Sequence, residues 1–210
     1  MPTPGSERPR RADAIRNRDA ILVAARQVFA RDGLDAPLDA VAREAGVGRA
    51  TQHRHFPTRE SLVRGIFDDN IELLDKIVRE VEDPADAYVV GVLATTQMMA
   101  HDRGFVDVFQ RPGAEDDLKV EVGDKWLKAL AEPLRQAQAA GRVRPDLRLE
   151  DSLLLIQMIA GTVHVQTDRL DERATRAMVL LLEAIADAGA RGTLDRRLVW
   201  PAELTKRSGG

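Results

Sequence analysis

Apolar residues along this chain recur at intervals of three or four positions, which is the spacing of one buried face of an α-helix. The first such stripe falls within residues 13–32 and consists of Ile15, Leu22, Ala25 and Phe29. Gly33 follows it where a helix C-cap glycine belongs, and Pro57 stops a later helix. The pattern predicts about nine helices, over residues 13–32, 38–45, 49–56, 59–81, a fifth from residue 84, and then 105–110, 115–140, 150–166 and 172–188.

Composition places the chain among ordinary soluble globular proteins. Hydrophobic residues make up 44% and charged residues 31% of its 210 residues. Cysteine is absent, which excludes disulfide frameworks, cysteine–zinc sites and cysteine nucleophiles. The longest uncharged run, residues 152–167, is too short and too interrupted to span a bilayer, and no secretory signal is recognisable. We therefore expect a cytoplasmic protein.

The net charge of −3 conceals an asymmetry along the chain. Residues 1–65 carry 12 Lys/Arg and 8 Asp/Glu, a net of +4, whereas residues 66–210 carry 19 Lys/Arg and 26 Asp/Glu, a net of −7. A basic N-terminal part and an acidic C-terminal part indicate that only the N-terminal part binds a polyanion, although random scatter of charge explains the difference equally well.

Residues 38–56, LDAVAREAGVGRATQHRHF, predict two short helices joined by a tight turn. Ala42 is small where the helices would cross, and Gly46 can adopt the positive φ that the turn requires. The apolar residues expected to lock the pair onto the preceding helix are Val41, Val47 and Phe56. This pattern is typical of a helix-turn-helix, whose second helix enters the major groove of DNA.

The second helix of this pair carries side chains suited to reading DNA. Arg49 can fork onto a guanine or clamp a phosphate, Thr51 can bond a phosphate or touch a thymine methyl, and Ala50 permits close approach. Backbone amides at the start of the next helix can hold a phosphate. The residues predicted to contact DNA are Arg18, Gly48, Arg49, Ala50, Thr51, His53, Arg54, His55, Thr58 and Arg59.

Residues 20–62 resemble the N-terminal domain of the TetR family of repressors. The resemblance lies in AILVAARQVFARDGLDAPLDAVAREAGVGRATQHRHFPTRESL, with the AGV turn at residues 45–47 and the PTRESL start of the following helix. The sequence AGRVRPDL, residues 140–147, is similar to a connection between the seventh and eighth helices of that family.

The predicted fold class is all-α, with a three-helix DNA-binding domain and a C-terminal helical bundle that dimerises through its last two helices. The expected divisions are a flexible basic arm over residues 1–11, the helix-turn-helix domain over 12–65, a ligand-binding and dimerisation domain over 66–191, and a tail over 192–210.

Three residues depart from the family's pattern. Gln52 replaces an apolar residue, so it either weakens the packing under the recognition helix or frees an amide for DNA. His53 stands where the family has a tyrosine that contacts phosphate, and Pro37 replaces the usual hydroxyl cap of the second helix. Whether Gln52 and His53 alter DNA reading is left open by the sequence.

The resemblance implies a homodimer, and the apolar character of the last two helices supports it. Both helices are apolar nearly all round, and a second subunit is the expected cover for such helices in so small a bundle, although burial within one subunit is the alternative. The predicted interface residues are Leu154, Met158, Met178, Leu181, Leu182 and Ile185.

The resemblance also implies a small-molecule pocket inside the bundle. Each candidate residue also fits plain core packing, and together they favour a largely apolar effector. The candidate lining residues are Tyr88, Thr96, Met99, Phe105, Phe109, Trp126, Gln157 and Met158.

Other function classes find less support. None of the four serines lies in a nucleophile-elbow sequence, there is no phosphate-binding glycine loop, and the histidines do not form a metal site, so we expect neither enzyme activity, nor a cofactor, nor a metal. The sequence predicts a repressor that a ligand releases from a palindromic operator on double-stranded DNA. The alternatives are an activator, a DNA-binding protein without a ligand, and a helical scaffold that binds protein only.

Overall fold

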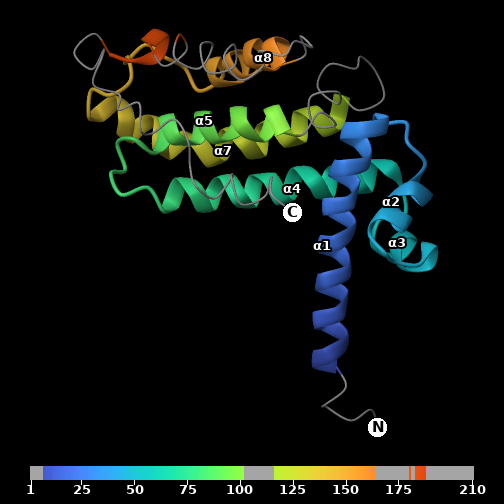
Figure 1. Cartoon of the computed structure of the whole chain (residues 1–210). Helices are drawn as coiled ribbons and strands as arrows, with labels where there is room; N and C mark the ends of the chain where they lie inside the picture. The colour runs from blue at the N-terminus through green and yellow to red at the C-terminus, as the bar shows by residue number, and fades with distance from the viewer. Residues whose placement is uncertain (1–6, 102–115, 164–179, 181–182, 188–210) are drawn as a thin grey trace. The chain divides into compact units, whose positions relative to one another are not determined.

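The computed structural model describes residues 7–101, 116–163, 180 and 183–187. In chain order its helices are α1 (Glu7–Asp32), α2 (Leu38–Glu44), α3 (Arg49–His55), α4 (Arg59–Arg79), α5 (Ala87–His101), α7 (Asp116–Ala139) and α8 (Asp151–Val163) (Figure 1). The extended pairing seen in these ranges is a single bridge between Val143 and Ala186, so the predicted all-α fold is confirmed. The helix predicted over residues 105–110, and most of the one over 172–188, lie outside the described residues.

Most helix boundaries agree with the sequence pattern, and two differ. The helices α2, α3, α4 and α7 begin and end within two residues of the predicted positions. However, α1 begins at Glu7, so residues 7–11 are helical and not part of a flexible arm. Pro9 is tolerated there because the first-turn amides of a helix have no intrahelical partner to lose. The fifth helix begins at Ala87, after a turn in which the Asp83 carboxylate accepts from the Ala85 amide at 2.9 Å.

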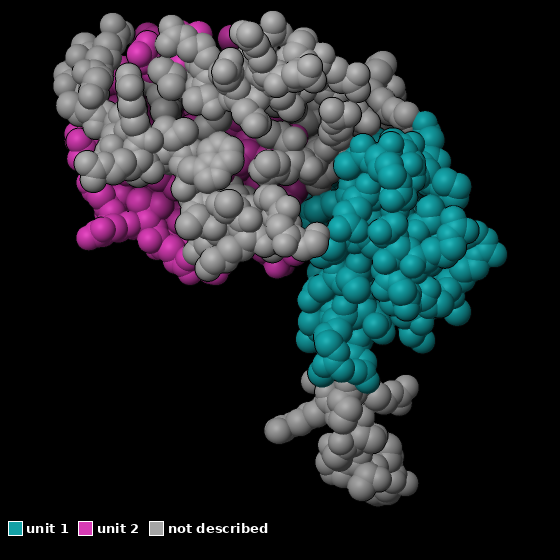
Figure 2. Space-filling view, in the orientation of Figure 1, with its two compact units in different colours: residues 1–68, 102–116 teal, residues 69–101, 117–210 magenta. Residues whose placement is uncertain are grey.

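The chain divides into two compact units (Figure 2). Unit 1 contains residues 1–68 and 102–116, and unit 2 contains residues 69–101 and 117–210. The division therefore falls within α4, three residues beyond the expected boundary at residue 65. No helix in the described ranges combines the length and the apolar character that a membrane crossing requires.

The core of unit 1 forms where α1 meets α2 and α3. The buried face of α1 begins at Ile21 and includes Leu22, Ala25, Val28 and Phe29. Ile15 was expected on this face but is 61% exposed, because the first turns of α1 extend beyond the helices that cover it (Figure 1). Gly33 ends α1 with φ of 80° and donates to the Phe29 carbonyl at 3.0 Å, as its predicted C-cap role requires.

The core of unit 2 is built around α5, whose residues 87–99 are all buried. Gly91 allows the close approach of neighbouring helices, since a Cβ there would lie 2.6 Å from Leu130 Cδ2 on α7 and 3.1 Å from Val78 Cγ2 on α4. The helix buried on every side is thus α5. The alternative that α8 is buried wholly within one subunit does not hold, because Leu154 and Met158 on α8 are 57% and 69% exposed in the single chain.

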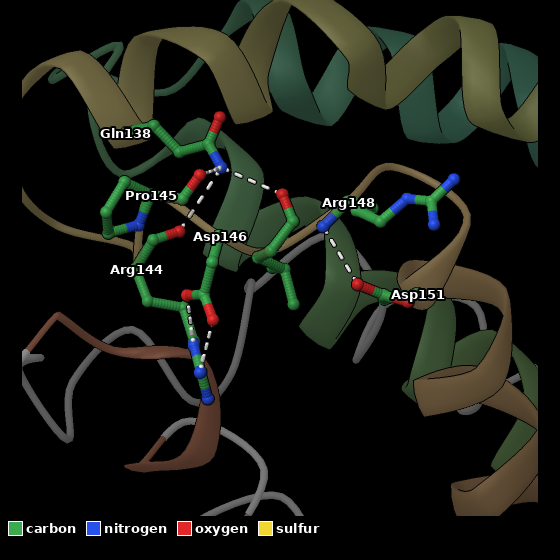
Figure 3. A network of polar contacts seen from close by, with 7 residues as sticks. Gln138, Arg144, Pro145, Asp146, Arg148 and Asp151 are labelled. Carbon is green, nitrogen blue, oxygen red and sulfur yellow. Dashed lines mark hydrogen bonds and ion pairs between the residues drawn. The ribbon is translucent and has the colours of Figure 1, made fainter.

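The connection between α7 and α8 is held by polar contacts (Figure 3). Gly141, with φ of 67°, ends the preceding helical turn. The Gln138 side-chain amide then donates to the carbonyls of Arg144, Pro145 and Leu147 at 3.2, 3.3 and 2.9 Å. The Arg148 amide donates to the Asp151 carboxylate at 2.8 Å at the start of α8. These bonds satisfy the backbone of an irregular segment and fix how α8 leaves α7.

Candidate nucleic-acid interface

The turn between α2 and α3 has the geometry expected of a helix-turn-helix. Gly46 adopts φ of 65°, and the Val47 amide donates to the Ala42 carbonyl at 3.0 Å. Ala42 and Val41 are buried beneath this turn. A side chain at position 46 would be strained, because L-residues rarely adopt this conformation. Pro37 precedes α2 with no side-chain cap bond, so the usual hydroxyl cap is indeed absent.

The residues of α3 divide into an exposed face and a buried face. Gly48, Ala50, His53 and Arg54 are exposed, as is Arg49, while Thr51 and His55 are half-buried. The Gly48 carbonyl accepts from the amides of Thr51 and Gln52 at 2.9 and 3.0 Å and so starts the helix. The structure therefore leaves Gly48, Arg49, Ala50, His53 and Arg54 accessible and covers Thr51 and His55 in part.

Gln52 faces inward and not toward the exposed face of α3. Its side chain is only 4% exposed, and its amide donates to the Phe56 carbonyl at 2.9 Å. The last carbonyls of a helix lack intrahelical partners, so this bond satisfies one of them. Of the two interpretations left open by the sequence, the one that frees the amide for DNA is wrong. Gln52 stabilises the C-terminal end of α3.

Phe56 anchors the same end of α3 in the core of unit 1. It is buried, and its ring lies over Gly65 of α4, where a Cβ would come within 2.6 Å of Phe56 Cε1 and 3.2 Å of Leu22 Cδ2. The guanidinium carbon of Arg18 lies 6.0 Å from the centre of the ring. Arg18 therefore supports the recognition helix through a cation–π contact, a role that the sequence did not reveal.

The start of α4 is closed by its own side chains. Thr58 and Ser61 form a reciprocal capping box, with the Ser61 amide donating to Thr58 Oγ1 at 3.0 Å and the Thr58 amide to Ser61 Oγ at 3.1 Å. The Arg59 guanidinium donates to the carbonyls of Asp35 and Ala36 at 3.3 and 2.9 Å. The Thr58 side chain thus caps α4, and the Arg59 side chain holds the loop before α2. A phosphate at this point would be left to the backbone amides.

Arg49, the first residue of α3, pairs with Asp39 in the first turn of α2. Its Nε donates to Asp39 Oδ1 and its Nη2 lies against Asp39 Oδ2, which makes the pair bidentate. The Arg49 side chain is nevertheless 76% exposed. The sequence singled out Arg49 but not Asp39, because a pairing ten residues apart across a turn leaves no local periodic signal.

Four of the predicted pocket residues, Tyr88, Thr96, Met99 and Trp126, lie in the core of unit 2. The polar atoms of Tyr88, Thr96 and Trp126 are already bonded. Burial raises the pKa of Tyr88 above its usual value, and its hydroxyl bonds Ser152 Oγ at 2.7 Å. The Trp126 indole donates to Thr95 Oγ1 at 2.8 Å, and Thr96 Oγ1 donates to the Val92 carbonyl at 2.9 Å. Met99 is buried beside them on α5. Ser152 and Thr95 were not among the candidates, since only the fold brings them to these partners.

Other predicted residues of the bundle lie elsewhere. Met158 is exposed, so it does not line the interior of one subunit. Ile185 is 1% exposed and belongs to the core of its own unit, which corrects its assignment to an intersubunit surface. Phe105, Phe109, Met178, Leu181, Leu182 and the side chain of Gln157 lie outside the described residues.

In a comparison with known proteins, both units match families of transcriptional regulators. Residues 21–66 match the family described as bacterial regulatory proteins, tetR family, and residues 83–186 match the C-terminal domain described as transcriptional regulator SbtR-like. The HTH-type transcriptional regulator SrpR of Pseudomonas putida is 26% identical over 180 residues, which cover 81% of this chain and 84% of SrpR.

Two solved structures agree with this result over nearly their whole length. A TetR transcriptional regulator of Streptomyces coelicolor is 31% identical, with a TM-score of 0.61 and coverage of 81% of this chain and 99% of that one. A TetR regulatory protein of Mycobacterium vanbaalenii is 30% identical, with a TM-score of 0.62 and coverage of 84% and 98%. The helix-turn-helix of unit 1 and the helical bundle of unit 2 together define a DNA-binding transcriptional regulator. The chain belongs to the TetR family.

The inward position of Gln52 makes a first prediction. Gln52→Leu should leave the base preference of the protein unchanged and shift its unfolding free energy by no more than about 1 kcal/mol, because one hydrogen bond is exchanged for apolar packing. Gln52→Glu is the matched contrast, since a buried carboxylate cannot donate to Phe56, and it should destabilise by about 2 kcal/mol or more. Urea unfolding and binding-site selection measure both, and an altered base preference in Gln52→Leu would contradict the assignment.

The contact between Gly65 and Phe56 makes a second prediction. Gly65→Ala should destabilise by about 1–3 kcal/mol, because the added methyl displaces the Phe56 ring and with it the end of α3. Gly123→Ala on α7 is the matched control, since its Cβ would meet only Leu153 Cδ1 at 3.8 Å. That variant should be as stable as the parent or more stable by up to about 1 kcal/mol. Thermal unfolding of the two variants side by side tests the contact, and equal stability would exclude it.

Proposed function

We propose that this regulator is a repressor that binds a palindromic operator as a homodimer and is released from it by a small, largely apolar molecule. The observation that carries the proposal is the two-sided character of α3. One side, with Arg49, Ala50, His53 and Arg54, is exposed, and the other is held by Gln52 and Phe56. Major-groove reading requires a helix that is packed against the protein along one face and exposed to solvent along the other.

The exposed side chains of α3 supply both kinds of contact that DNA recognition uses. Arg49 offers hydrogen-bond donors to base edges, and Arg54 and His53 offer donors to phosphates. Thr51 in the same helix is half-buried and can touch a thymine methyl or a phosphate. The basic balance of residues 1–65 supports attraction to the phosphate backbone in the same part of the chain.

The exposed apolar residues of α8 support the homodimer. Leu154 and Met158 are four residues apart, so they share one face of the helix, and both are more than half exposed. A self-complementary contact of this face would bury them against the same face of a second copy. Two recognition helices would then meet half-sites about one helical turn, roughly 10 base pairs, apart.

Release by a ligand is supported by the way α4 is shared between the units. This helix contributes Gly65 and Ile66 to unit 1, and Leu74 and Ile77 to unit 2. A molecule bound among the buried residues of unit 2 could therefore shift α4, the helix that also carries Gly65, against which Phe56 packs. Ligand binding would lower the affinity for the operator by at most the ratio of the ligand's affinities for the released and the DNA-bound conformations. An activator, or a DNA-binding protein without a ligand, is the alternative that the same helix-turn-helix would serve.

Selection of binding sites from fragmented genomic DNA of the host tests the proposal directly. Enrichment of a two-fold symmetric sequence is the expected result, and the neighbouring genes would indicate the class of effector. A ligand that raises the melting temperature and weakens operator binding supports release. Absence of any enriched sequence at low salt would refute operator recognition.

The exposed face of α3 makes a third prediction. Arg49→Ala should weaken operator binding by about 1–3 kcal/mol through loss of a bidentate base contact, and Thr51→Ala by about 1 kcal/mol. Arg79→Ala is the control, because Arg79 is an equally exposed arginine paired with an acid, Asp75, on α4 in unit 2. Fluorescence anisotropy measures the affinities, and sedimentation should show an unchanged oligomeric state. Full operator affinity in both α3 variants would exclude this helix as the reader.

The exposed face of α8 makes a fourth prediction. Leu154→Asp and Met158→Asp should each weaken dimerisation by about 2 kcal/mol or more, since an unpaired carboxylate would be buried at an apolar contact. Val120→Asp on α7 is the matched control, because Val120 is 65% exposed and lies outside the proposed interface. Sedimentation equilibrium measures the three variants. Equal loss of dimer in the control, or no loss in the α8 variants, would contradict the proposed interface.

A further inference from the structure

The pairing of Arg49 with Asp39 extends the proposed function to a residue of α2. We infer that Asp39 is a specificity-determining residue that holds one edge of the Arg49 guanidinium and so presents the opposite edge to a guanine. The inference rests on the proposed function, because it requires that the exposed face of α3 reads DNA. Asp39 is a positioning residue in this scheme, and Arg49 makes the contact with the base.

The atoms used by the pair leave the base-reading edge of Arg49 available. A guanidinium carries five N–H donors in a planar fork, with one edge formed by Nε and Nη2 and another by Nη1 and Nη2. Asp39 engages the first edge, through Nε and Nη2. Two parallel donors remain on the second edge, and the O6 and N7 acceptors of guanine match such a pair in the major groove.

The position of Asp39 makes it a fixed support for a mobile side chain. Asp39 lies in the first turn of α2, where the helix dipole favours a carboxylate, and α2 is packed in the core through Val41 and Ala42. Arg49, by contrast, is 76% exposed on its side chain and would otherwise sample many rotamers. The carboxylate therefore removes much of the conformational entropy that Arg49 would lose on binding a base.

The same carboxylate also counters indiscriminate binding. Arg49 by itself would be attracted to any phosphate, since phosphate attraction does not depend on sequence. Asp39 neutralises that charge locally and repels a phosphate that approaches the pair. A guanine edge is neutral and can still accept the two remaining hydrogen bonds. The pair thus weakens non-specific binding more than it weakens binding to the correct base.

The test compares the full-length parent protein with Asp39→Ala, Arg49→Ala and the double variant. Binding sites are first selected with the parent, and affinities are then measured for the selected operator and for operators with each guanine replaced. The guanine that Arg49 reads is the one whose replacement no longer changes the affinity of Arg49→Ala. At this guanine, the ratio of affinities for the selected and the replaced operator should be about tenfold smaller in Asp39→Ala than in the parent. Its salt dependence should steepen by about 0.9 in log–log slope, because the released Arg49 takes a phosphate.

The double variant separates positioning from a merely structural effect. If Asp39 acts through Arg49, its removal costs no further discrimination once Arg49 is alanine, so the double variant should equal Arg49→Ala. Asp32→Ala is the charge-matched control, since it removes the same charge from unit 1, where Asp32 pairs with Arg31 at 3.0 Å. The control should keep the parent's base preference. Asp39→Asn preserves shape and one acceptor, so it gives a folded variant of intermediate discrimination even if Asp39→Ala unfolds.

The possible failures are distinguishable. If the parent enriches a sequence and Arg49→Ala loses one guanine preference, but Asp39→Ala and Asp39→Asn both keep it, the inference is overturned and the proposed function stands. An Arg49→Ala variant with the parent's preferences at every guanine would also overturn it. If the parent enriches no sequence, the proposed function fails, and the inference fails with it.

Discussion

The support of Phe56 at the C-terminal end of α3 is the constraint on which the DNA-binding unit depends. Its ring occupies the space over Gly65 that any Cβ would fill, and it also lies beside Leu22 of α1. Gln52 bonds its carbonyl and Arg18 lies over its ring, so three helices hold one residue. Because α3 has only seven residues and little stability of its own, its orientation is set by this anchor and by the turn at Gly46.

The polar contacts around this anchor explain why several basic residues are not simply surface charges. Arg59 holds the carbonyls of the loop before α2, and Arg49 is held by Asp39 at the start of that helix. Side-chain contacts that join α2, α3 and α4 thus hold both the loop before α2 and the side chain of Arg49. In unit 2, buried Tyr88 and Trp126 are similarly bonded to Ser152 and Thr95, so any molecule that entered that core would have to replace or rearrange satisfied hydrogen bonds.

The parts of the fold that follow from local pattern were predictable. Helix periodicity, the glycines that end α1 and α7, and the AGV turn place the described helices within a few residues, apart from the start of α1, because these signals act over one or two turns of chain. The errors arose where burial depends on distant partners. Ile15 continues the apolar stripe of α1 but lies beyond the helices that cover it, and Ile185 is taken into the core of its own unit.

The sequence by itself determined the helix-turn-helix and its family, and it singled out the residues of α3 that are exposed, because the turn glycine and the apolar positions around it form a local pattern. Only the tertiary structure decided which way Gln52 faces, that Arg18 lies over Phe56, and that Asp39 holds Arg49. Each of these contacts joins residues on different turns or helices, so its existence depends on how those elements pack. Sequence spacing fixes which residues share a side of a helix, and packing decides what that side faces and which side chains it meets.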